Sequence, residues 1–364
     1  MGVAPPRSDR AFDCIVVGAG VNGLAAARAL ARTGARTALL ERFGLRHDHG
    51  SSHGDSRSVR HYPQAEWMAL WREAERLWKE LEEETGVELL RPVGVFTHAH
   101  ELRGELDSLV SLGVPAVAVD APEAQRRFGI RMPPTGESYF DPTSGYILAA
   151  RACDALAASC TGHGVTIIEG AEVIALSPSA QDVTVSTALH GSFTAEVAIV
   201  AAGAWVRELL APLGIRLPVH VSLETVAYFG APGQVSLPVM VDYATADEVT
   251  GRGIYALPSP ALGLKVAAHH SGARSDEVPQ SREPDARVVE RLTRWVGEHL
   301  PQLDATVTRA ETCLYTVAPD DELLLFREGR LVVGSACSGH AFKFATATGE
   351  RLARLAATRR ADAS

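Results

Sequence analysis

Residues 13–41 of this chain read DCIVVGAGVNGLAAARALARTGARTALLE. Residues 15–17 form an apolar run, which is typical of a strand buried on both faces of a sheet. A helical pattern of small and apolar residues then extends to Gly34, and residues 37–40 form a second apolar run. The stretch therefore predicts a strand, a tight turn, a helix and a second strand, which together open a Rossmann-like α/β sheet.

Three glycines in this stretch have the spacing G-x-G-x-x-G. Gly18 permits a sharp turn, Gly20 lets the backbone approach a pyrophosphate, and Gly23 lets the helix pack close to the strand. Glu41 ends the second strand, where a carboxylate suits hydrogen bonds to ribose hydroxyls. These features predict a bound dinucleotide, but the motif alone does not separate NAD from FAD. A glycine-rich turn that binds nothing is the alternative.

The overall composition narrows the class of protein. The chain has 364 residues, of which 46% are hydrophobic, and this length is sufficient for a large core or for two lobes. Its formal net charge is −9, and lysine and arginine do not cluster along it. We therefore expect no nucleic-acid partner.

The cysteines and the apolar runs bear on the compartment. The five cysteines have neither C-x-x-C nor metal-ligand spacing: Cys14, Cys153, Cys160, Cys313 and Cys337. This pattern favours free thiols in a reducing compartment and predicts no metal site. Residues 1–10 read as a loose arm without a signal peptide, and no apolar run is long enough for a membrane span. We expect a soluble cytoplasmic protein with no membrane partner.

The order of predicted elements indicates two lobes. Helices are predicted at 64–85 and 349–357, strands at 192–197 and 198–202, and a run of antiparallel strands from about residue 218 to residue 268. A parallel α/β lobe is thus interrupted and later resumed, and a ligand would lie in the crevice between the lobes. The predicted division is 1–88, 146–216 and 312–364 for the nucleotide-binding lobe, and 89–145 and 217–311 for the substrate lobe.

Three late segments carry reactive side chains. In GLKVAAHHSG, residues 263–272, the alternation of a strand puts Lys265 and His269 on one face, which could equally face solvent. Cys313 lies in a predicted strand, where a cysteine is usually a small buried hydrophobe. Lys343 lies between two phenylalanines, and its alternative is a loop lysine that extends to solvent.

These segments, together with GSSHGDSRSVRHY at 50–62 and AGAW at 202–205, occur in a specific order. The sequence closely resembles the monomeric sarcosine oxidase family of flavoprotein amine oxidases, which includes N-methyltryptophan oxidase and pipecolate oxidase. The resemblance covers nearly the whole chain. It implies FAD as the cofactor and an α/β fold, with a discontinuous Rossmann-like FAD-binding lobe and a mixed, mostly antiparallel β substrate lobe.

The resemblance assigns residues on the flavin side. Cys313 matches the cysteine that forms a thioether to the 8α-methyl of FAD, so covalent flavin is expected. Lys265 matches the lysine that holds a water near flavin N5 and promotes reaction with O2, and Arg57 matches an arginine close to it. Further cofactor contacts are expected from Arg42, Ser52, His53, Gly339, His340 and Lys343.

The resemblance also assigns the substrate side. Arg60 and Lys343 match the pair that binds the substrate carboxylate, and a guanidinium with an ammonium suits that group. Tyr255, His269 and Tyr315 match residues that line the substrate cavity, and His269 is a candidate electrostatic tuner rather than a base.

The implied reaction oxidises a secondary or cyclic α-amino acid to an imine, while O2 is reduced to hydrogen peroxide. The family name favours a monomer that acts on a small molecule. Three alternatives remain: a dehydrogenase of the same fold with another electron acceptor, a flavin-binding protein without catalysis, and a nicotinamide-linked dehydrogenase.

Several positions depart from the family pattern. Ala267 and Ala268 replace a Gly-Tyr pair, Cys337 replaces an aromatic residue, and the chain after Arg60 is short. Residues 244–252, which should help to cover the cavity, hold one bulky apolar residue. We expect these departures to touch the cavity, and they predict a substrate larger than sarcosine.

Overall fold

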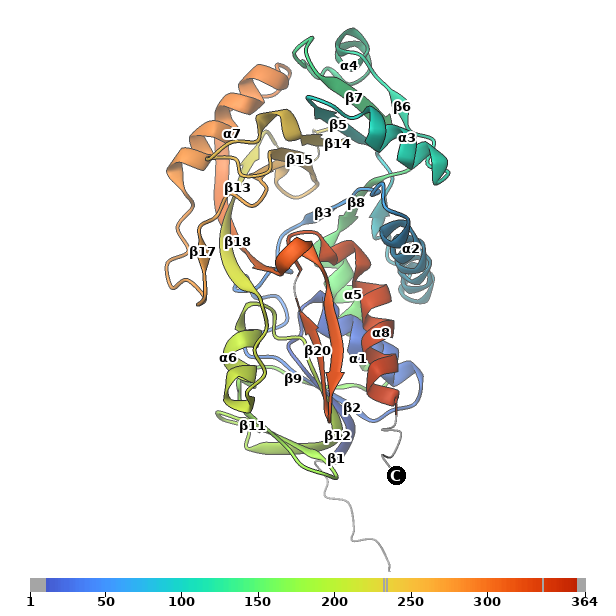
Figure 1. The fold of residues 1–364 in the computed structure, drawn as a ribbon, viewed down its shortest axis with the longest axis vertical. Coiled ribbons are helices and arrows are strands. Elements are labelled where there is room, and N and C mark those ends of the chain that lie inside the picture. Colours follow the sequence, from blue (N-terminus) through green and yellow to red (C-terminus); the bar gives the residue numbers. More distant parts are fainter. Residues whose placement is uncertain (1–10, 232, 234, 336, 359–364) are drawn as a thin grey trace, which may run out of the picture.

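Two large β-sheets lie one above the other along the long axis of the molecule (Figure 1). The computed structural model describes residues 11–358 except residues 232, 234 and 336. The arm expected at residues 1–10 therefore lies outside the described residues.

The lower sheet is built around the first strand of the fingerprint. β1 (Ala11–Val17) pairs in parallel with β2 (Thr37–Leu40) on one side and β12 (Ser192–Val200) on the other. The sheet is completed by β9 (Thr166–Ile168), β10 (Val173–Pro178), β11 (Val183–Thr187), β19 (Leu324–Glu328) and β20 (Leu331–Ser335). β9 and β20 extend the parallel part of the sheet, whereas β10, β11 and β19 are antiparallel to their neighbours.

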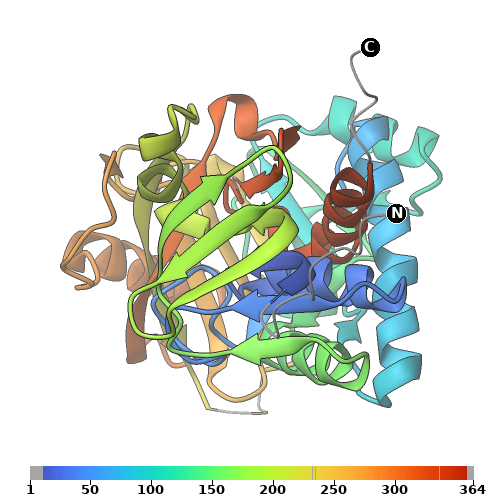
Figure 2. The same ribbon diagram turned by 90° about the horizontal axis from the view of Figure 1, so that it is seen from below.

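Alternate residues of β1 enter two separate cores. Val16 packs with the helices on one face, whereas Ile15 and Val17 pack on the other face. The helical face is covered by α1 (Val21–Arg32), α2 (Ala65–Thr85), α5 (Ala149–Gly162) and α8 (Ala345–Ala357) (Figure 1). The opposite face is covered by β10, β11 and α6 (Val206–Leu210), and Figure 2 shows the strands crossing in front of the sheet. The prediction of a strand buried on both faces is confirmed.

Two predicted boundaries in this part are wrong. The segments 192–197 and 198–202 form one continuous strand, β12, which pairs with β11 through its first half and with β20 through its second. The last helix begins at Ala345 and not at Gly349, which lies inside the helix. A Cβ on Gly349 would lie within 3 Å of Ala25, so this glycine permits close packing of α8 on α1.

The upper sheet is mixed and mostly antiparallel. Its order is β17-β13-β16-β15-β14-β5-β7-β6, and β18 pairs with β13 beside this path. The only parallel pair along that path is β5 with β14. The strands are β5 (Val95–Ala99), β6 (Val117–Ala118), β7 (Glu137–Asp141), β13 (His220–Phe229), β14 (Val239–Asp242), β15 (Ile254–Ser259), β16 (Gly263–Ala268), β17 (Arg274–Ser275) and β18 (Val307–Val317). The helices beside it are α3 (Arg103–Ser111), α4 (Ala121–Phe128) and α7 (Ala286–His299). The predicted fold class is confirmed.

A small third sheet lies between the two large ones. β8 (Gly145–Leu148) pairs with β3 (Ser56–Val59) and with β4 (Leu90–Arg91). β3 lies inside the polar segment 44–62, which the sequence did not predict as a strand. The short 3₁₀ helices are Gly203–Trp205, Ala211–Leu213, Tyr243–Thr245, Pro319–Asp321 and Ala341–Phe344. Within residues 11–358, apart from the three gaps, no helix is long and apolar enough to cross a membrane.

A buried polar network joins the small sheet to the upper one. His61, just beyond β3, places its Nδ1 atom 2.8 Å from Oδ2 of Asp141, at the end of β7. Thr143 donates its backbone N–H and its hydroxyl to Asp141 at 2.9 and 2.7 Å, and Ser144 donates its hydroxyl. Burial would raise the pKa of Asp141, but bonds from His61 and Ser144 lower it to about 2. This carboxylate therefore stabilises the fold in its charged form.

We expect Asp141→Asn to lower the free energy of unfolding at pH 7 by about 2 kcal/mol, which is roughly the pKa shift converted at 1.36 kcal/mol per unit. Because the folded pKa is depressed, this contribution is complete above about pH 4, the unfolded pKa, and is lost as the pH falls through 2. Urea unfolding at several pH values measures it. Asp107→Asn, at an exposed position on α3, is the control and should change nothing. Equal losses in the two variants would contradict the assigned role.

Candidate active site

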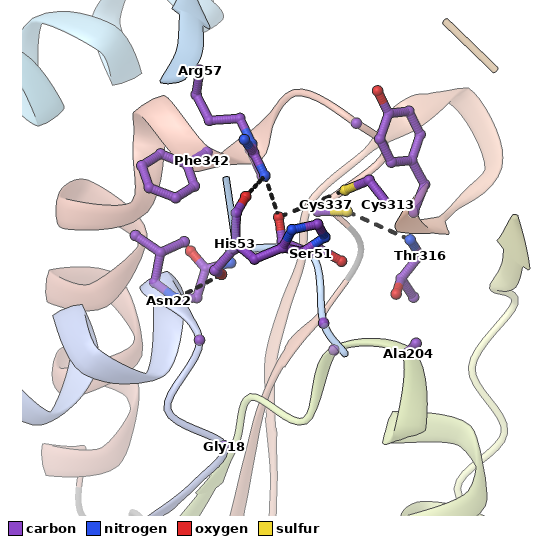
Figure 3. A pocket seen from close by; sticks show the side chains of 18 of the residues that line it. Gly18, Asn22, Ser51, His53, Arg57, Ala204, Cys313, Thr316, Cys337 and Phe342 are labelled. Atoms are coloured by element: carbon purple, nitrogen blue, oxygen red, sulfur yellow. Dashed lines mark hydrogen bonds between the residues drawn. The ribbon is translucent and has the colours of Figure 1, made fainter. Parts of the chain in front are cut away.

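The glycine turn between β1 and α1 forms one end of the site. Gly18 has φ +97°, and a Cβ on Gly23 would lie 1.8 Å from the Gly18 carbonyl oxygen. The start of the helix therefore lies directly against the turn, as predicted for the two glycines. The Val21 N–H donates to Ser52 Oγ at 3.0 Å, and this bond joins the polar segment 44–62 to the first turn of the helix. Figure 3 shows Gly18 on this side of the pocket.

The two residues after β2 complete this end. Glu41 is buried and accepts hydrogen bonds from the Ala19 N–H at 2.7 Å and the Phe43 N–H at 2.9 Å. Arg42 pairs with Glu172 at 3.0 Å and lies 5.7 Å from the ring centroid of Trp205. The carboxylate is thus fixed beside the turn by the backbone, and its role toward a ribose stays a prediction.

One cavity of about 570 Å³ runs from the glycine turn to the upper sheet. Of the predicted site residues, Gly23 packs behind the turn and does not line the cavity. The others all line it: Gly18, Gly20, Glu41, Arg42, Ser52, His53, Arg57, Arg60, Tyr255, Lys265, His269, Cys313, Tyr315, Gly339, His340 and Lys343. Residues from four distant parts of the sequence therefore meet on one surface.

Arg57 is held by backbone carbonyl groups. Its guanidinium donates to Ser51 O at 2.8 Å, to Ser56 O at 2.9 Å, and to the carbonyl of His53 (Figure 3). Its other neighbour is the ring of Phe342, whose centroid lies 5.6 Å from the guanidinium carbon. The polar segment 44–62 thus wraps around the Arg57 guanidinium, and its carbonyl groups hold that positive charge in place.

Lys265 shares a carbonyl with Arg57. Its Nζ donates to Ser56 O at 3.4 Å, and its side chain enters the cavity from β16. The residue is 4% exposed, so the alternative in which this face of the strand meets solvent is wrong. Burial, with a smaller effect of Arg57, lowers the pKa of Lys265 to about 7. Near neutral pH this amine can therefore be either charged or neutral.

Cys313 lies on the same side of the cavity. Its Sγ is 3.9 Å from Ser51 O, and Figure 3 shows it beside Cys337, whose Sγ accepts a bond from the Thr316 N–H at 3.4 Å. Burial raises the pKa of the Cys313 thiol, whereas Arg57 and Lys265 act to lower it. A buried cysteine fits both readings of the sequence, so its link to a flavin stays a prediction.

Arg60 and Lys343 meet at the ring of Tyr62. The guanidinium carbon of Arg60 lies 4.6 Å from the ring centroid, and Nζ of Lys343 lies 4.3 Å from it. Nζ also donates to the Tyr62 hydroxyl at 3.3 Å. Lys343 is 3% exposed, so the alternative of a lysine that extends to solvent is wrong. Burial lowers the pKa of Lys343 below its ordinary value. Tyr62 acts to raise this pKa, whereas Arg60 lowers it further.

His269 is a neutral ring on the substrate side. Its Nδ1 lies 3.4 Å from the Tyr315 hydroxyl, and its ring centroid lies 6.3 Å from that of Tyr255. Burial, reinforced by the neighbouring His270, lowers its pKa well below the usual value. The imidazole therefore contributes a dipole and a hydrogen-bonding group rather than a charge at neutral pH.

Some of the departures from the family pattern do not reach the cavity. Ala267 and Ala268 are fully buried and pack into the cores of the upper sheet, so the expectation that they touch the cavity is wrong. Within the described residues of the segment 244–252, Arg252 is the one that lines the cavity. Tyr243, just before this segment, lines the cavity instead.

The residues present fit a flavin dinucleotide. At Gly18 and Gly20 the turn presents backbone without a side chain to the cavity, which suits a pyrophosphate. Among the described residues that line the cavity, two ring nitrogens, His53 Nε2 and His340 Nδ1, are buried without a hydrogen-bond partner. Unpaired polar atoms of this kind are costly unless a ligand satisfies them. An FAD molecule supplies both the phosphates and ring heteroatoms that such a surface lacks.

The family model for FAD dependent oxidoreductases matches residues 13–355. The chain is 32% identical over 361 residues to human peroxisomal sarcosine oxidase, covering 94% of this chain and 92% of that protein. It is 30% identical over 365 residues to monomeric sarcosine oxidase of Bacillus sp. strain NS-129, covering 95% and 93%. The open form of NikD, an amino acid oxidase essential for nikkomycin biosynthesis, superimposes with a TM-score of 0.87 at 27% identity, covering 97% and 96%.

The chain therefore belongs to the FAD dependent oxidoreductase family, among its flavin-dependent amine and amino-acid oxidases. It is an oxidoreductase enzyme, and the predicted family is confirmed. The individual site assignments stay predictions.

Sequence reasoning missed three polar groups around the substrate end. Tyr243 and Arg252 line the cavity, and Glu105 contacts Arg60 from α3. None belongs to a recognisable motif. Glu105 lies 45 residues from its partner, so the sequence carried no local signal for the contact.

Proposed function

We propose that this enzyme oxidises the C–N bond of a secondary or cyclic α-amino acid to an imine and passes the electrons to O2, which yields hydrogen peroxide. The observation that carries the proposal is a pair of basic side chains, the half-buried Arg60 and the buried Lys343, against one tyrosine ring on the cavity that begins at the glycine turn. Glu105 offsets part of the charge of Arg60, and an α-carboxylate supplies the second negative charge that the two cations need.

The substrate end of the cavity suits a neutral secondary amine. Arg60 and Lys343 bind the carboxylate and fix the orientation of the α-carbon. His269 stays uncharged at neutral pH and adds no repulsion or attraction for a charged amine. Tyr255 and Tyr315 surround the rest of the substrate with ring faces and hydroxyl groups. The residues thus select a pose, and no residue is assigned as a base.

The opposite part of the cavity suits the cofactor. The glycine turn, Ser52, His53, Gly339 and His340 would hold FAD, which when bound supplies the two-electron acceptor for the C–N oxidation. Lys265 would hold a positive charge where electrons reach oxygen. The free thiols favour a reducing compartment, so we propose a cytoplasmic protein; its relatives' names favour a monomer.

The first experiment combines acid precipitation with a substrate panel. Purified protein is precipitated, the flavin spectrum of the pellet is recorded, and secondary amino acids are screened with peroxide detection. Peroxide formed in proportion to substrate supports the proposal. Reduction of an artificial dye without peroxide would instead support the dehydrogenase of the same fold, and protein without flavin would contradict the assignment.

We expect Cys313→Ala to release flavin into the supernatant on acid precipitation, because the thioether to the 8α-methyl would be absent. Cys337→Ala is the matched control, since this second cysteine lines the same cavity. It should retain flavin in the pellet. A pellet of Cys313→Ala that remains yellow would place the link on another residue.

We expect Lys265→Met to slow reoxidation of the reduced enzyme by O2 by about a hundredfold, the usual effect of removing one preorganised charge-stabilising group. Reduction by substrate under anaerobic conditions should change little. Rapid mixing separates the two half-reactions, and Lys79→Met, on the exposed face of α2, is the control. Equal slowing of both half-reactions would contradict the role in oxygen chemistry.

We expect Arg60→Ala to raise KM for pipecolate by about tenfold to a hundredfold, because a charge-assisted hydrogen bond contributes about 1.5–3 kcal/mol. Oxidation of piperidine, the same ring without a carboxylate, should be much less affected. Steady-state peroxide assays on the two amines give the comparison. A similar loss on both would show that Arg60 does not bind the carboxylate.

A further inference from the structure

Arg60 has a protein carboxylate beside it. Its Nη1 atom lies 3.4 Å from Oε1 of Glu105, which belongs to α3. Both side chains are largely buried, and Glu105 is the carboxylate that pairs with Arg60 in the described part of the chain. The rings of Tyr62 and Tyr243 also contact the guanidinium, with centroids 4.6 and 5.3 Å from its central carbon.

Glu105 is itself fixed by the upper sheet. The Tyr139 hydroxyl, on β7, donates to the same Oε1 atom at 2.6 Å, and Tyr139 is fully buried. Glu137, two residues earlier on β7, accepts bonds at 2.6 Å from the N–H groups of Leu102 and Arg103 at the start of α3. The helix start and the strand are therefore tied together next to Glu105, which leaves its carboxylate little freedom to move.

Glu105 contacts one edge of the Arg60 guanidinium and partly neutralises its positive charge. Arg60 and Lys343 lie against one ring, so two cations face a substrate group of single negative charge. A carboxylate behind Arg60 offsets part of that excess and favours a single orientation of the fork. The Tyr139 hydroxyl donates to the Glu105 oxygen that faces Arg60, and this hydrogen bond keeps the Glu105 carboxylate beside the guanidinium.

We propose that Glu105 is a positioning residue of the carboxylate-binding pair: anchored by Tyr139, it orients Arg60 toward the substrate carboxylate. The inference rests on the proposed function of Arg60. Glu105 acts through Arg60 alone and does not touch the substrate. Its loss therefore weakens binding of carboxylates only when Arg60 is present.

The test is a double-mutant cycle read by ligand binding. Benzoate binding to the flavin-loaded protein is followed by the change in the visible flavin spectrum, with benzamide as the neutral control. Glu105→Gln keeps the shape of the side chain and should raise the Kd of benzoate about tenfold. Tyr139→Phe should act in the same direction with a smaller effect, and Glu101→Gln, at an exposed site before α3, should have none.

The decisive comparison uses Arg60→Ala. Adding Glu105→Gln to Arg60→Ala should produce no further loss, because the residue through which Glu105 acts is already absent. The same loss in both backgrounds would overturn the proposal, as would tighter benzoate binding in Glu105→Gln, which would show that Glu105 competes with the ligand. The assay needs no turnover. If no secondary amino acid is oxidised but the cycle behaves as expected, the positioning role stands and the proposed reaction fails.

Discussion

Four basic side chains lie around a single cavity, two of them buried and two half-buried, and this constraint governs how the site is built. Arg57, Arg60, Lys265 and Lys343 all line the cavity that begins at the glycine turn. Removing a charge from water costs several kcal/mol unless the protein or a ligand compensates for it. The compensation here is uneven. Arg57 has three carbonyl groups, whereas Lys265 has one carbonyl at 3.4 Å and Lys343 one hydroxyl at 3.3 Å. The least compensated of the four are therefore the two lysines: Lys343, in the proposed carboxylate pair, and Lys265, at the proposed site of the reaction with O2.

The carbonyl of Ser56 connects this electrostatic constraint to the fold. It accepts from Arg57, next to it on β3, and from Lys265 on β16 of the upper sheet. The same segment continues to Arg60 and to His61, which contacts Asp141 on β7. One short polar segment therefore carries Arg57 and Arg60 and contacts Lys265 of the upper sheet, and the small sheet of β3, β4 and β8 holds that segment in place.

The sequence predicted best those features whose partners are close along the chain or repeated across a family. The glycine turn follows from local sterics, and the strand and helix around it follow from hydrophobic periodicity. The residues that line the cavity were found through motifs that keep their order. The start of α8 was missed because Gly349 was read as a helix boundary, although it serves the contact with Ala25 on another helix. A glycine's role depends on its neighbour in space, which one sequence does not specify.

The same limit explains the errors at the substrate end. Ala268 faces away from Lys265 and packs in a different core, whereas Ala267 packs with Tyr255, Cys313 and Tyr315, and neither alanine lines the cavity. The role of Glu105 could not be predicted from the sequence. It lies on an amphipathic helix, and the pattern of that helix indicates only an exposed surface. Tyr139 and Glu137 bring that helix to Arg60 through tertiary contacts. Reactive groups at the flavin end are thus predictable from motifs, whereas the groups that tune the substrate end depend on how the upper sheet packs its own helices.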